Sequence, residues 1–420
     1  MVEDRWFDTA RFGMFVHWGH SSQQGIELSW PLTGWGVTAG AGAQVTVEQY
    51  HASAGTFDPR AYDPRAWARL AKACGMQYAV FTTKHHDGYC MWDTKTTDFS
   101  VMRSPCGRDI VREYVDAFRA EGVRPGFYFS LADWHHPDYP AFTQDDAPYK
   151  FPVGKPIDPE RWPAFVEVMF AQIRELLTNY GEISVLWFDG QWERSIDQWR
   201  AKELRELIVG LQPGIMINDR LPGQGGYATP EQFVPAQSPA GPWETCLTMN
   251  ETWAYNPTDT RYKSARALVH RLCEIAGKGG NLLLNVGPRG DGSLPPEQVE
   301  RLEAVAAWMA RHGESIAGTQ AGLEPWQFYG PSTRRGETVY LHLLMRPYVD
   351  VSVRGVRVKR VKSVRALGTG EALRFSVRTS IADTLFNPDP VGELTIAVPE
   401  RAIDEMATVI AVEFADGPMA

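Results

Sequence analysis

The chain has 420 residues and a mass of 47.1 kDa, which is too long for one ordinary compact domain unless one domain is a large barrel. Hydrophobic residues make up 44% of the chain and the mean hydropathy is -0.31, so we expect extensive burial and exclude a disordered, collagenous or coiled-coil protein. The formal net charge of -9, without a run of Lys or Arg, argues against nucleic acid or an anionic membrane surface as the partner. We expect a small ligand.

The N-terminal run from Met1 to Phe15 has no apolar signal region, and no stretch of the chain approaches roughly 18 apolar residues. The five cysteines are odd in number and include no CxxC pair, so neither a disulfide framework nor a zinc cluster is expected. These features predict a soluble, cytoplasmic protein without a membrane span or a cofactor.

Tryptophan divides the chain into two parts. All 15 tryptophans lie between Trp6 and Trp326. From about Gly336 the pattern changes to short β-rich runs, at Thr338–Leu344, Val349–Val358 and Leu394–Val398. We therefore expect a first domain over 1–330 and a second over 331–420, the second folded as a small antiparallel β-sandwich.

Strands and helices alternate along the first domain. Short apolar runs predict strands buried on both faces at Met14–Val16, Tyr78–Thr82, Gly126–Ser130, Ile183–Phe188, Ile215–Ile217 and Leu282–Val286. Asp63 and Asp109 are expected to cap helices, and further helices are expected over 165–180, 196–211, 264–276 and 296–311. This α/β pattern favours a (β/α)8-like TIM barrel, with a doubly wound open sheet as the alternative.

Polar and aromatic residues follow several of the predicted strands, where a βα barrel gathers its reacting groups. The runs are His17–Trp18, Lys84–Asp87, Asp133–His136, Trp187–Trp192 and Asn218–Arg220, with Tyr128 inside the third strand. Aromatic planes beside His, Asp and Arg suit a sugar, whose C–H face stacks on rings while its hydroxyls need directed hydrogen bonds.

Several of these residues also have structural interpretations. His17 alone is more often a structural histidine than a ligand, and Asp189 could cap a helix. The pairs His85-His86 and His135-His136 suggest a metal, but adjacent residues of an extended strand point to opposite faces, and there is no HExxH motif. We therefore expect no metal site. The glycine-rich run Gly277–Gly280 lacks the GK[ST] ending of a phosphate loop and is interpreted as a helix C-terminus.

Five motifs make the sequence resemble glycoside hydrolase family 29, the retaining α-L-fucosidases. They are Phe12–Gly19, Thr83–Gly88, Leu186–Gly190, Ile217–Arg220 and Gly280–Pro288. The resemblance implies a barrel-like catalytic domain followed by a β-sandwich. It also implies hydrolysis of terminal α-L-fucosyl residues from oligosaccharides or glycoconjugates, by double displacement through a covalent fucosyl-enzyme intermediate.

The resemblance also assigns residues to the site. It implies that Asp189 is the nucleophile and leaves two candidates for the acid/base, of which Glu231 is favoured over Glu244. Either glutamate would need a raised pKa to be protonated at the working pH. The residues implied as substrate contacts are His17, Glu27, Trp30, His85, His86, Tyr128, Trp187 and Arg220.

Two other functions stay open. One is a metal-dependent barrel hydrolase that uses the histidine pairs, and the other is a non-catalytic fucose-binding protein. The expected partner is a small fucosylated carbohydrate, and a homo-oligomer is left open. The preferred linkage and aglycone depend on loops such as Thr33–Gln44 and Pro222–Pro242, and a structural role is expected for the second domain, which has no tryptophan.

Overall fold

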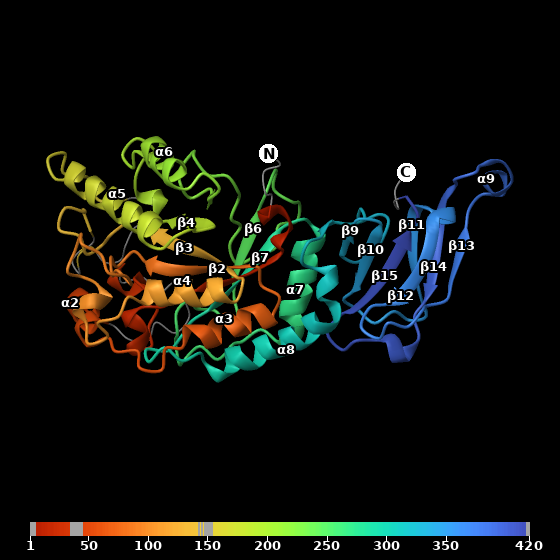
Figure 1. Cartoon of the computed structure of the whole chain (residues 1–420), viewed down its shortest axis with the longest axis horizontal. Coiled ribbons are helices and arrows are strands. Elements are labelled where there is room, and N and C mark those ends of the chain that lie inside the picture. The colour runs from red at the N-terminus through yellow and green to blue at the C-terminus, as the bar shows by residue number, and fades with distance from the viewer. Residues whose placement is uncertain (1–5, 34–44, 142, 144–145, 147–153, 417–420) are drawn as a thin grey trace.

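Seven parallel strands form the first sheet of the protein (Figure 1). The computed structural model describes residues 6–33, 45–141, 143, 146 and 154–416. The strands are β1 (Phe12–Val16), β2 (Tyr78–Lys84), β3 (Arg124–Ser130), β4 (Val185–Asp189), β5 (Met216–Ile217), β6 (Glu244–Thr248) and β7 (Asn281–Val286). Their order is β5-β4-β3-β2-β1-β7-β6, and six of them are the predicted ones. Strand β6 was not predicted, because it begins with Glu244 and contains polar residues at Thr245 and Thr248.

Residues 227–231 close the gap between β5 and β6. Parallel bridges join Asn218 to Tyr227, Ala228 to Trp243 and Glu231 to Cys246. The ring of strands is therefore continuous, which confirms the (β/α)8-like barrel and excludes the doubly wound open sheet. The closing segment carries Glu231, one of the two acid/base candidates.

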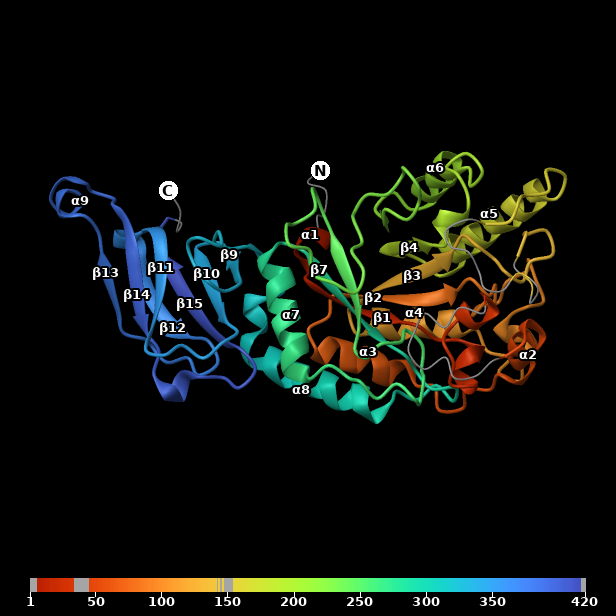
Figure 2. The ribbon, with the colours of Figure 1, turned by 180° about the vertical axis from the view of Figure 1, so that it is seen from behind.

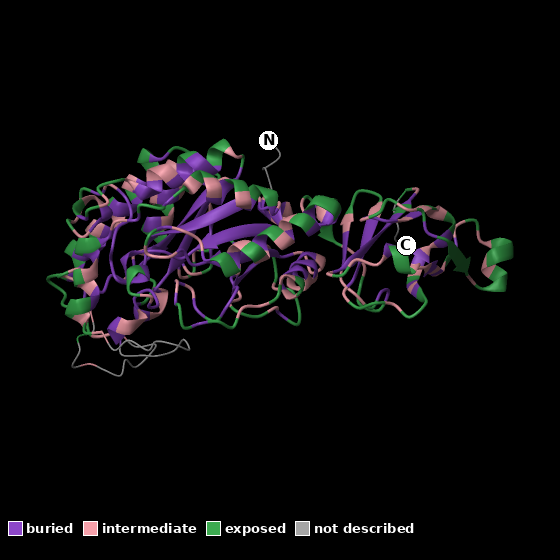
Figure 3. Ribbon diagram, turned by 90° about the horizontal axis from the view of Figure 1, so that it is seen from below, coloured by how far each residue is buried: buried purple, intermediate pink, exposed green. Residues whose placement is uncertain are grey.

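Helices cover the outside of the barrel and bury one face each (Figure 3). They are α3 (Pro64–Ala73), α4 (Ile110–Ala120), α5 (Trp162–Asn179), α6 (Ala201–Leu211), α7 (Ala265–Gly277) and α8 (Pro296–His312). Asp63 and Asp109 accept the backbone N–H groups of Ala66 and Arg112 at 2.9 and 2.8 Å, as the predicted caps should. Helix α7 ends at the predicted glycine-rich run. Helix α6 begins later than predicted, because Arg200 has a φ of 49° and interrupts the helical backbone.

The barrel interior forms a core of its own. The buried side chains are those of Phe7, Ala10, Phe15, Tyr78, Val80, Tyr128, Val185, Trp187, Tyr227, Cys246 and Leu283. The short helix α1 (Phe7–Ala10) contributes Phe7, whose ring centroid lies 4.5 Å from that of Tyr227. A larger core fills the space between the strands and the surrounding helices. The barrel interior is therefore packed and does not form a channel.

The second unit is the expected antiparallel β-sandwich, which Figure 2 shows beside α7 and α8. One sheet contains β8 (Gln320–Ala321), β9 (Ser332–Arg335), β10 (Thr338–Leu343), β12 (Val361–Ala366) and β15 (Thr408–Phe414). The other contains β11 (Asp350–Arg357), β13 (Phe375–Arg378) and β14 (Val391–Ala397). Strand β8 already belongs to the sandwich, while the division into 1–330 and 331–420 stays a prediction.

The two units are in contact through α8. The indole of Trp308 donates to the carbonyl oxygen of Ala407 at 3.0 Å, and His312 lies 3.2 Å from the carboxylate of Asp404. All five cysteines are free thiols. None of the helices in the described ranges has both the length and the apolar composition that a membrane crossing requires.

Candidate active site

A cavity of about 330 Å³ lies where the C-terminal ends of the barrel strands meet. Its walls contain Phe15, His17, Trp30, His85, Tyr128, Trp187, Asp189, Gln191, Trp192, Arg220, Glu231 and Trp253. A larger cavity, of about 990 Å³, lies at the opposite end of the strands beside Phe7 and Met216, but it contains none of the predicted site residues. The smaller cavity is therefore the candidate active site.

Asp189 is the last residue of β4 and its carboxylate belongs to the cavity wall. Tyr128 donates its hydroxyl to Oδ2 at 2.9 Å, and Arg220 donates to Oδ1 at 2.9 Å. Burial by itself raises the pKa of this carboxyl, but Arg220 and His86 lower it to about 2. The side chain caps none of the described helices, so the structural interpretation of Asp189 is wrong.

Arg220 connects the two carboxyl groups of the cavity. Its second terminal nitrogen donates to Oε2 of Glu231 at 2.6 Å, while the first bonds Asp189. The side chain of Asp189 is 12% exposed and that of Glu231 is 37% exposed. Glu231 therefore lies on the more open side of the guanidinium, and Asp189 lies on the enclosed side.

Burial keeps the three histidines beside Asp189 neutral. It lowers the pKa of His17 and His85 to about 3 and that of His86 to about 4, and the neighbouring histidines and Arg220 contribute to the lowering. At neutral pH these rings therefore offer one hydrogen-bond donor and one acceptor each.

Hydrogen-bond partners determine the tautomers of these rings. Nδ1 of His17 lies 2.7 Å from Oδ1 of Asn285, which can only accept, so Nε2 of His17 is an acceptor. Nδ1 of His86 lies 2.7 Å from the Ser130 hydroxyl, which donates its own proton to Ala132, so Nε2 of His86 is an acceptor as well. It lies 3.7 Å from Asp189.

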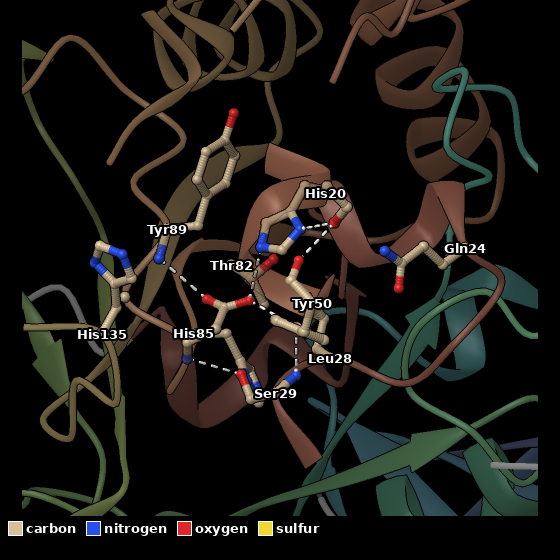
Figure 4. A network of polar contacts seen from close by, with 12 residues as sticks. His20, Gln24, Leu28, Ser29, Tyr50, Thr82, His85, Tyr89 and His135 are labelled. Atoms are coloured by element: carbon tan, nitrogen blue, oxygen red, sulfur yellow. Dashed lines mark hydrogen bonds and ion pairs between the residues drawn. The ribbon is translucent and has the colours of Figure 1, made fainter. Parts of the chain in front are cut away.

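Ser29 gives His85 the opposite tautomer. The Ser29 hydroxyl accepts the backbone N–H of Asp87 at 2.8 Å and has its proton available for Nδ1 of His85, 2.6 Å away. Nε2 of His85 therefore carries the ring proton. Ser29 has a φ of 60°, and the Tyr50 hydroxyl holds its backbone by accepting its N–H at 2.7 Å, as Figure 4 shows. The site thus pairs acceptor rings with a donor ring, which suits sugar hydroxyls.

Two glutamates expected in the site do not line the cavity. Glu27 is buried, and its carboxylate accepts the backbone N–H groups of Leu28, Trp253 and Ala254. Burial raises its pKa to about 7 although these bonds oppose the rise. Glu244 has no exposed surface, because it is the first residue of β6 and points into the barrel interior. Glu27 thus holds the backbone of Trp253, which does line the cavity, while its expected contact with substrate stays a prediction.

The two adjacent histidines do not point apart as expected. Strand β2 ends at Lys84, so His85 and His86 follow it outside the extended backbone, and their ring centroids lie 4.1 Å apart. Ligand atoms of both rings and of Asp189 lie within 4.8 Å of one another, a group that could hold a metal ion. Arg220, however, is bonded to Asp189, and its positive charge opposes a second cation there.

Four residues of the wall were not among the predicted substrate contacts: Phe15, Gln191, Trp192 and Trp253. Phe15, Gln191 and Trp192 lie inside or beside quoted motifs, so their position next to His17 and Asp189 could have indicated them. Trp253 follows β6, whose polar residues hide it in the hydrophobic pattern. Of the loop Thr33–Gln44, residues 34–44 lie outside the described ranges.

The known proteins to which this chain is similar are α-L-fucosidases. The family model of α-L-fucosidase matches residues 2–314. Tissue α-L-fucosidase of Bos taurus is 30% identical over 404 residues, which cover 89% of this chain and 82% of the bovine protein. The structure of α-L-fucosidase isoenzyme 1 from Paenibacillus thiaminolyticus is 37% identical, with a TM-score of 0.84 and 99% of both chains covered.

A second solved structure bears on the chemistry. It is an α-L-fucosidase GH29 from Bacteroides thetaiotaomicron, trapped as a covalent intermediate with 2-fluoro-fucosyl fluoride. It is 26% identical to this chain, with a TM-score of 0.81 and coverage of 98% of this chain and 95% of that one. The chain described here belongs to the α-L-fucosidases of glycoside hydrolase family 29.

Proposed function

We propose that this glycoside hydrolase removes terminal α-L-fucosyl residues from fucosylated carbohydrates with retention of the anomeric configuration, through a fucosyl ester on Asp189. The observation that carries the proposal is the Arg220 guanidinium, which bonds one oxygen of Asp189 and one of Glu231 in a cavity walled by aromatic rings. A retaining glycosidase needs two such carboxyl groups close together, one as nucleophile and one as acid and base.

Asp189 supplies the nucleophile in this mechanism. With a pKa of about 2 it is ionised at neutral pH, and its two oxygens are oriented by Tyr128 and Arg220. A carboxylate oxygen forms a bond to the anomeric carbon while the bond from that carbon to the leaving oxygen breaks. The covalent intermediate trapped in the Bacteroides thetaiotaomicron enzyme supports this chemistry for the family.

Glu231 supplies the proton in the first step and removes one in the second. It protonates the leaving oxygen, then accepts a proton from the water that attacks the anomeric carbon and releases Asp189 as a carboxylate. Glu244 has a pKa that burial raises to about 7, as a general acid requires, but it lies outside the cavity wall. A proton donor must reach the leaving oxygen, so the geometry supports Glu231.

The remaining wall residues suit a sugar. Sugar hydroxyls can donate to Nε2 of His17 and accept from Nε2 of His85, and the C–H face can pack on an indole ring. The rings of Trp30 and Trp192 are nearly parallel, with centroids 6.2 Å apart, and both line the same cavity. We assign the wall residues His17, His85, Tyr128, Trp187 and Arg220 to the fucosyl ring, and Trp30 to the same wall. His86 is buried outside the wall, 3.7 Å from Asp189, and its contact with the sugar stays a prediction.

Hydrolysis of 4-nitrophenyl α-L-fucoside tests the proposal. The first fucose released should be the α anomer by NMR, and Asp189→Ala should nearly abolish turnover because the attacking carboxylate is lost. Azide should rescue this variant and yield β-L-fucosyl azide. Asp197→Ala, at an exposed aspartate outside the cavity, should behave as the unaltered enzyme.

Two outcomes of this experiment would contradict the proposal. Wild-type-like turnover by Asp189→Ala would remove that residue from the mechanism, and release of the β anomer first would exclude retention. Treatment with EDTA tests the metal-dependent alternative. Turnover should not change, because the Arg220 guanidinium already bonds the Asp189 carboxylate that a metal ion would need. Binding of fucose without any turnover would favour the non-catalytic alternative.

A further inference from the structure

A buried carboxyl group lies in the barrel interior next to the wall of the active site. Glu244 has no exposed surface, and its side chain accepts two hydrogen bonds, one on each oxygen. The indole N–H of Trp187 donates to Oε1 at 3.0 Å, and the Tyr78 hydroxyl donates to Oε2. Burial raises the pKa of Glu244 to about 7, against the effect of these two bonds. A group so costly to desolvate needs its partners to stay in place.

Trp187 connects Glu244 to the nucleophile. It precedes Asp189 by two positions on β4, so both side chains project to the same face of the strand. Its ring stacks on Tyr128 with centroids 5.5 Å apart, and the Arg220 guanidinium lies 4.5 Å from its centroid. Tyr128 and Arg220 are the two groups that bond the oxygens of Asp189. The indole therefore lies between the buried carboxyl and both groups that orient the nucleophile.

The backbone of β1 leaves room for the second partner of Glu244. Gly13 lies against the Tyr78 ring, and a Cβ atom at this position would come within 2.6 Å of Cζ of Tyr78. A glycine at this position of the Phe12–Gly19 motif is therefore required by the ring whose hydroxyl reaches Glu244. The close packing of Gly13 on the Tyr78 ring keeps the Tyr78 hydroxyl on Glu244. Trp187 connects Glu244 to the active site.

We propose that Glu244 is a positioning residue, whose carboxyl fixes the Trp187 indole and through it the alignment of Tyr128 and Arg220 on Asp189. This role rests on the proposed function of Asp189 as nucleophile. In this role, Glu244 is necessary for turnover without touching the sugar. A substitution there would resemble loss of a catalytic group.

A double-mutant cycle tests the coupling. Glu244→Leu removes the acceptor, and Trp187→Phe removes the donor while it keeps an aromatic ring. Each should lower kcat/KM by about tenfold or more, because a buried polar group loses its partner or the ring loses its anchor. The double variant should lose no more than the worse single variant, whereas independent effects would multiply. Glu244→Gln keeps an acceptor for the indole and should stay within about threefold of the unaltered enzyme.

The dependence on the leaving group distinguishes positioning from acid catalysis. Glu244→Leu should slow 4-nitrophenyl and phenyl α-L-fucosides by the same factor, because a misplaced nucleophile and wall affect every substrate. Glu231→Gln should slow the phenyl fucoside far more, because phenol is the poorer leaving group and needs the proton. Glu244→Leu should also bind an iminocyclitol inhibitor more weakly than the unaltered enzyme does. Calorimetry measures this affinity independently of turnover.

Three results would overturn the assignment. They are multiplicative losses in the double variant, an unchanged kcat/KM in Trp187→Phe, and a Glu244→Gln variant that loses the phenyl substrate selectively. Trp187→Phe tests the same hydrogen bond from its other end, so the proposal stays testable if Glu244→Leu does not fold. Wild-type-like turnover by Asp189→Ala would instead contradict the proposed function. The two proposals can therefore fail independently, since each depends on different variants.

Discussion

Arg220 determines the electrostatics of the site at the scale of a single residue. Its planar guanidinium has donors on two sides, so one side chain can hold Asp189 and Glu231 together. The same charge lowers the pKa of Asp189 despite the burial of that carboxyl. The enclosed carboxyl of Asp189 can therefore stay ionised while that of Glu231 lies toward the opening.

Arg220→Lys should lower kcat/KM by about tenfold to a hundredfold. A lysine keeps the positive charge but is a single point donor, which cannot form the two-sided arrangement. The pKa of Asp189 should rise as a result, and the acid limb of the kcat/KM profile should move to higher pH. Steady-state rates from pH 4 to 8 measure both effects. Arg200→Lys, at a surface ion pair with Glu203, should change neither, and an unaltered profile in Arg220→Lys would contradict the role given to the guanidinium.

Two short elements decide which residues meet in the cavity. The segment 227–231 pairs with its neighbours through isolated bridges, yet it closes the barrel and carries Glu231 to the cavity. Glu244 is the first residue of β6 and lies at the end of the strand away from the cavity. Trp253 follows the other end of β6 and lines the cavity. The position of a glutamate on its strand thus decides whether it faces the cavity or the packed interior.

Gly13→Ala should destabilise the protein by about 1–3 kcal/mol, because the added Cβ would overlap the Tyr78 ring in a packed interior. Urea unfolding followed by circular dichroism measures the change. Gly210→Ala is the matched control, since a Cβ at this position of α6 meets no atom within 4 Å. The control should be neutral or more stable by up to about 1 kcal/mol. Equal stability of both variants would show that Tyr78 can move away from β1.

Across the whole molecule, five histidines couple stability to pH. Burial lowers the pKa values of His17, His51, His85, His86 and His342 from 6.5 to about 3 or 4. Their contribution to stability is complete above pH 6.5 and is lost as the pH falls toward the folded values, because the unfolded chain binds the protons. Glu27 and Glu244 act in the opposite direction: with pKa values raised from 4.5 to about 7, they favour folding most below pH 4.5 and lose that contribution as the pH rises through 7.

The melting temperature should therefore fall as the pH is lowered from 6.5 to 4.5, since these histidines outnumber the two glutamates. Scanning calorimetry at pH 7.5, 6.5, 5.5 and 4.5 measures the fall. His342→Gln removes one of the buried rings, in the β-sandwich and away from the cavity, and should show a smaller fall. A melting temperature that rises over this interval would mean that the glutamates outweigh the histidines.

Local sequence was enough to predict six of the seven barrel strands, most helix ends and the residues that follow those strands, because these depend on local hydrophobic pattern and capping. It also determined the family, through motifs that each lie within a few residues. Only the folded chain shows that Glu231 lines the cavity while Glu27 and Glu244 do not, and that the rings of His85 and His86 lie together beside Asp189. The reason is that a side chain's direction at a strand end depends on where the extended backbone stops and on which distant segment closes the barrel, and neither is encoded in the few residues around it.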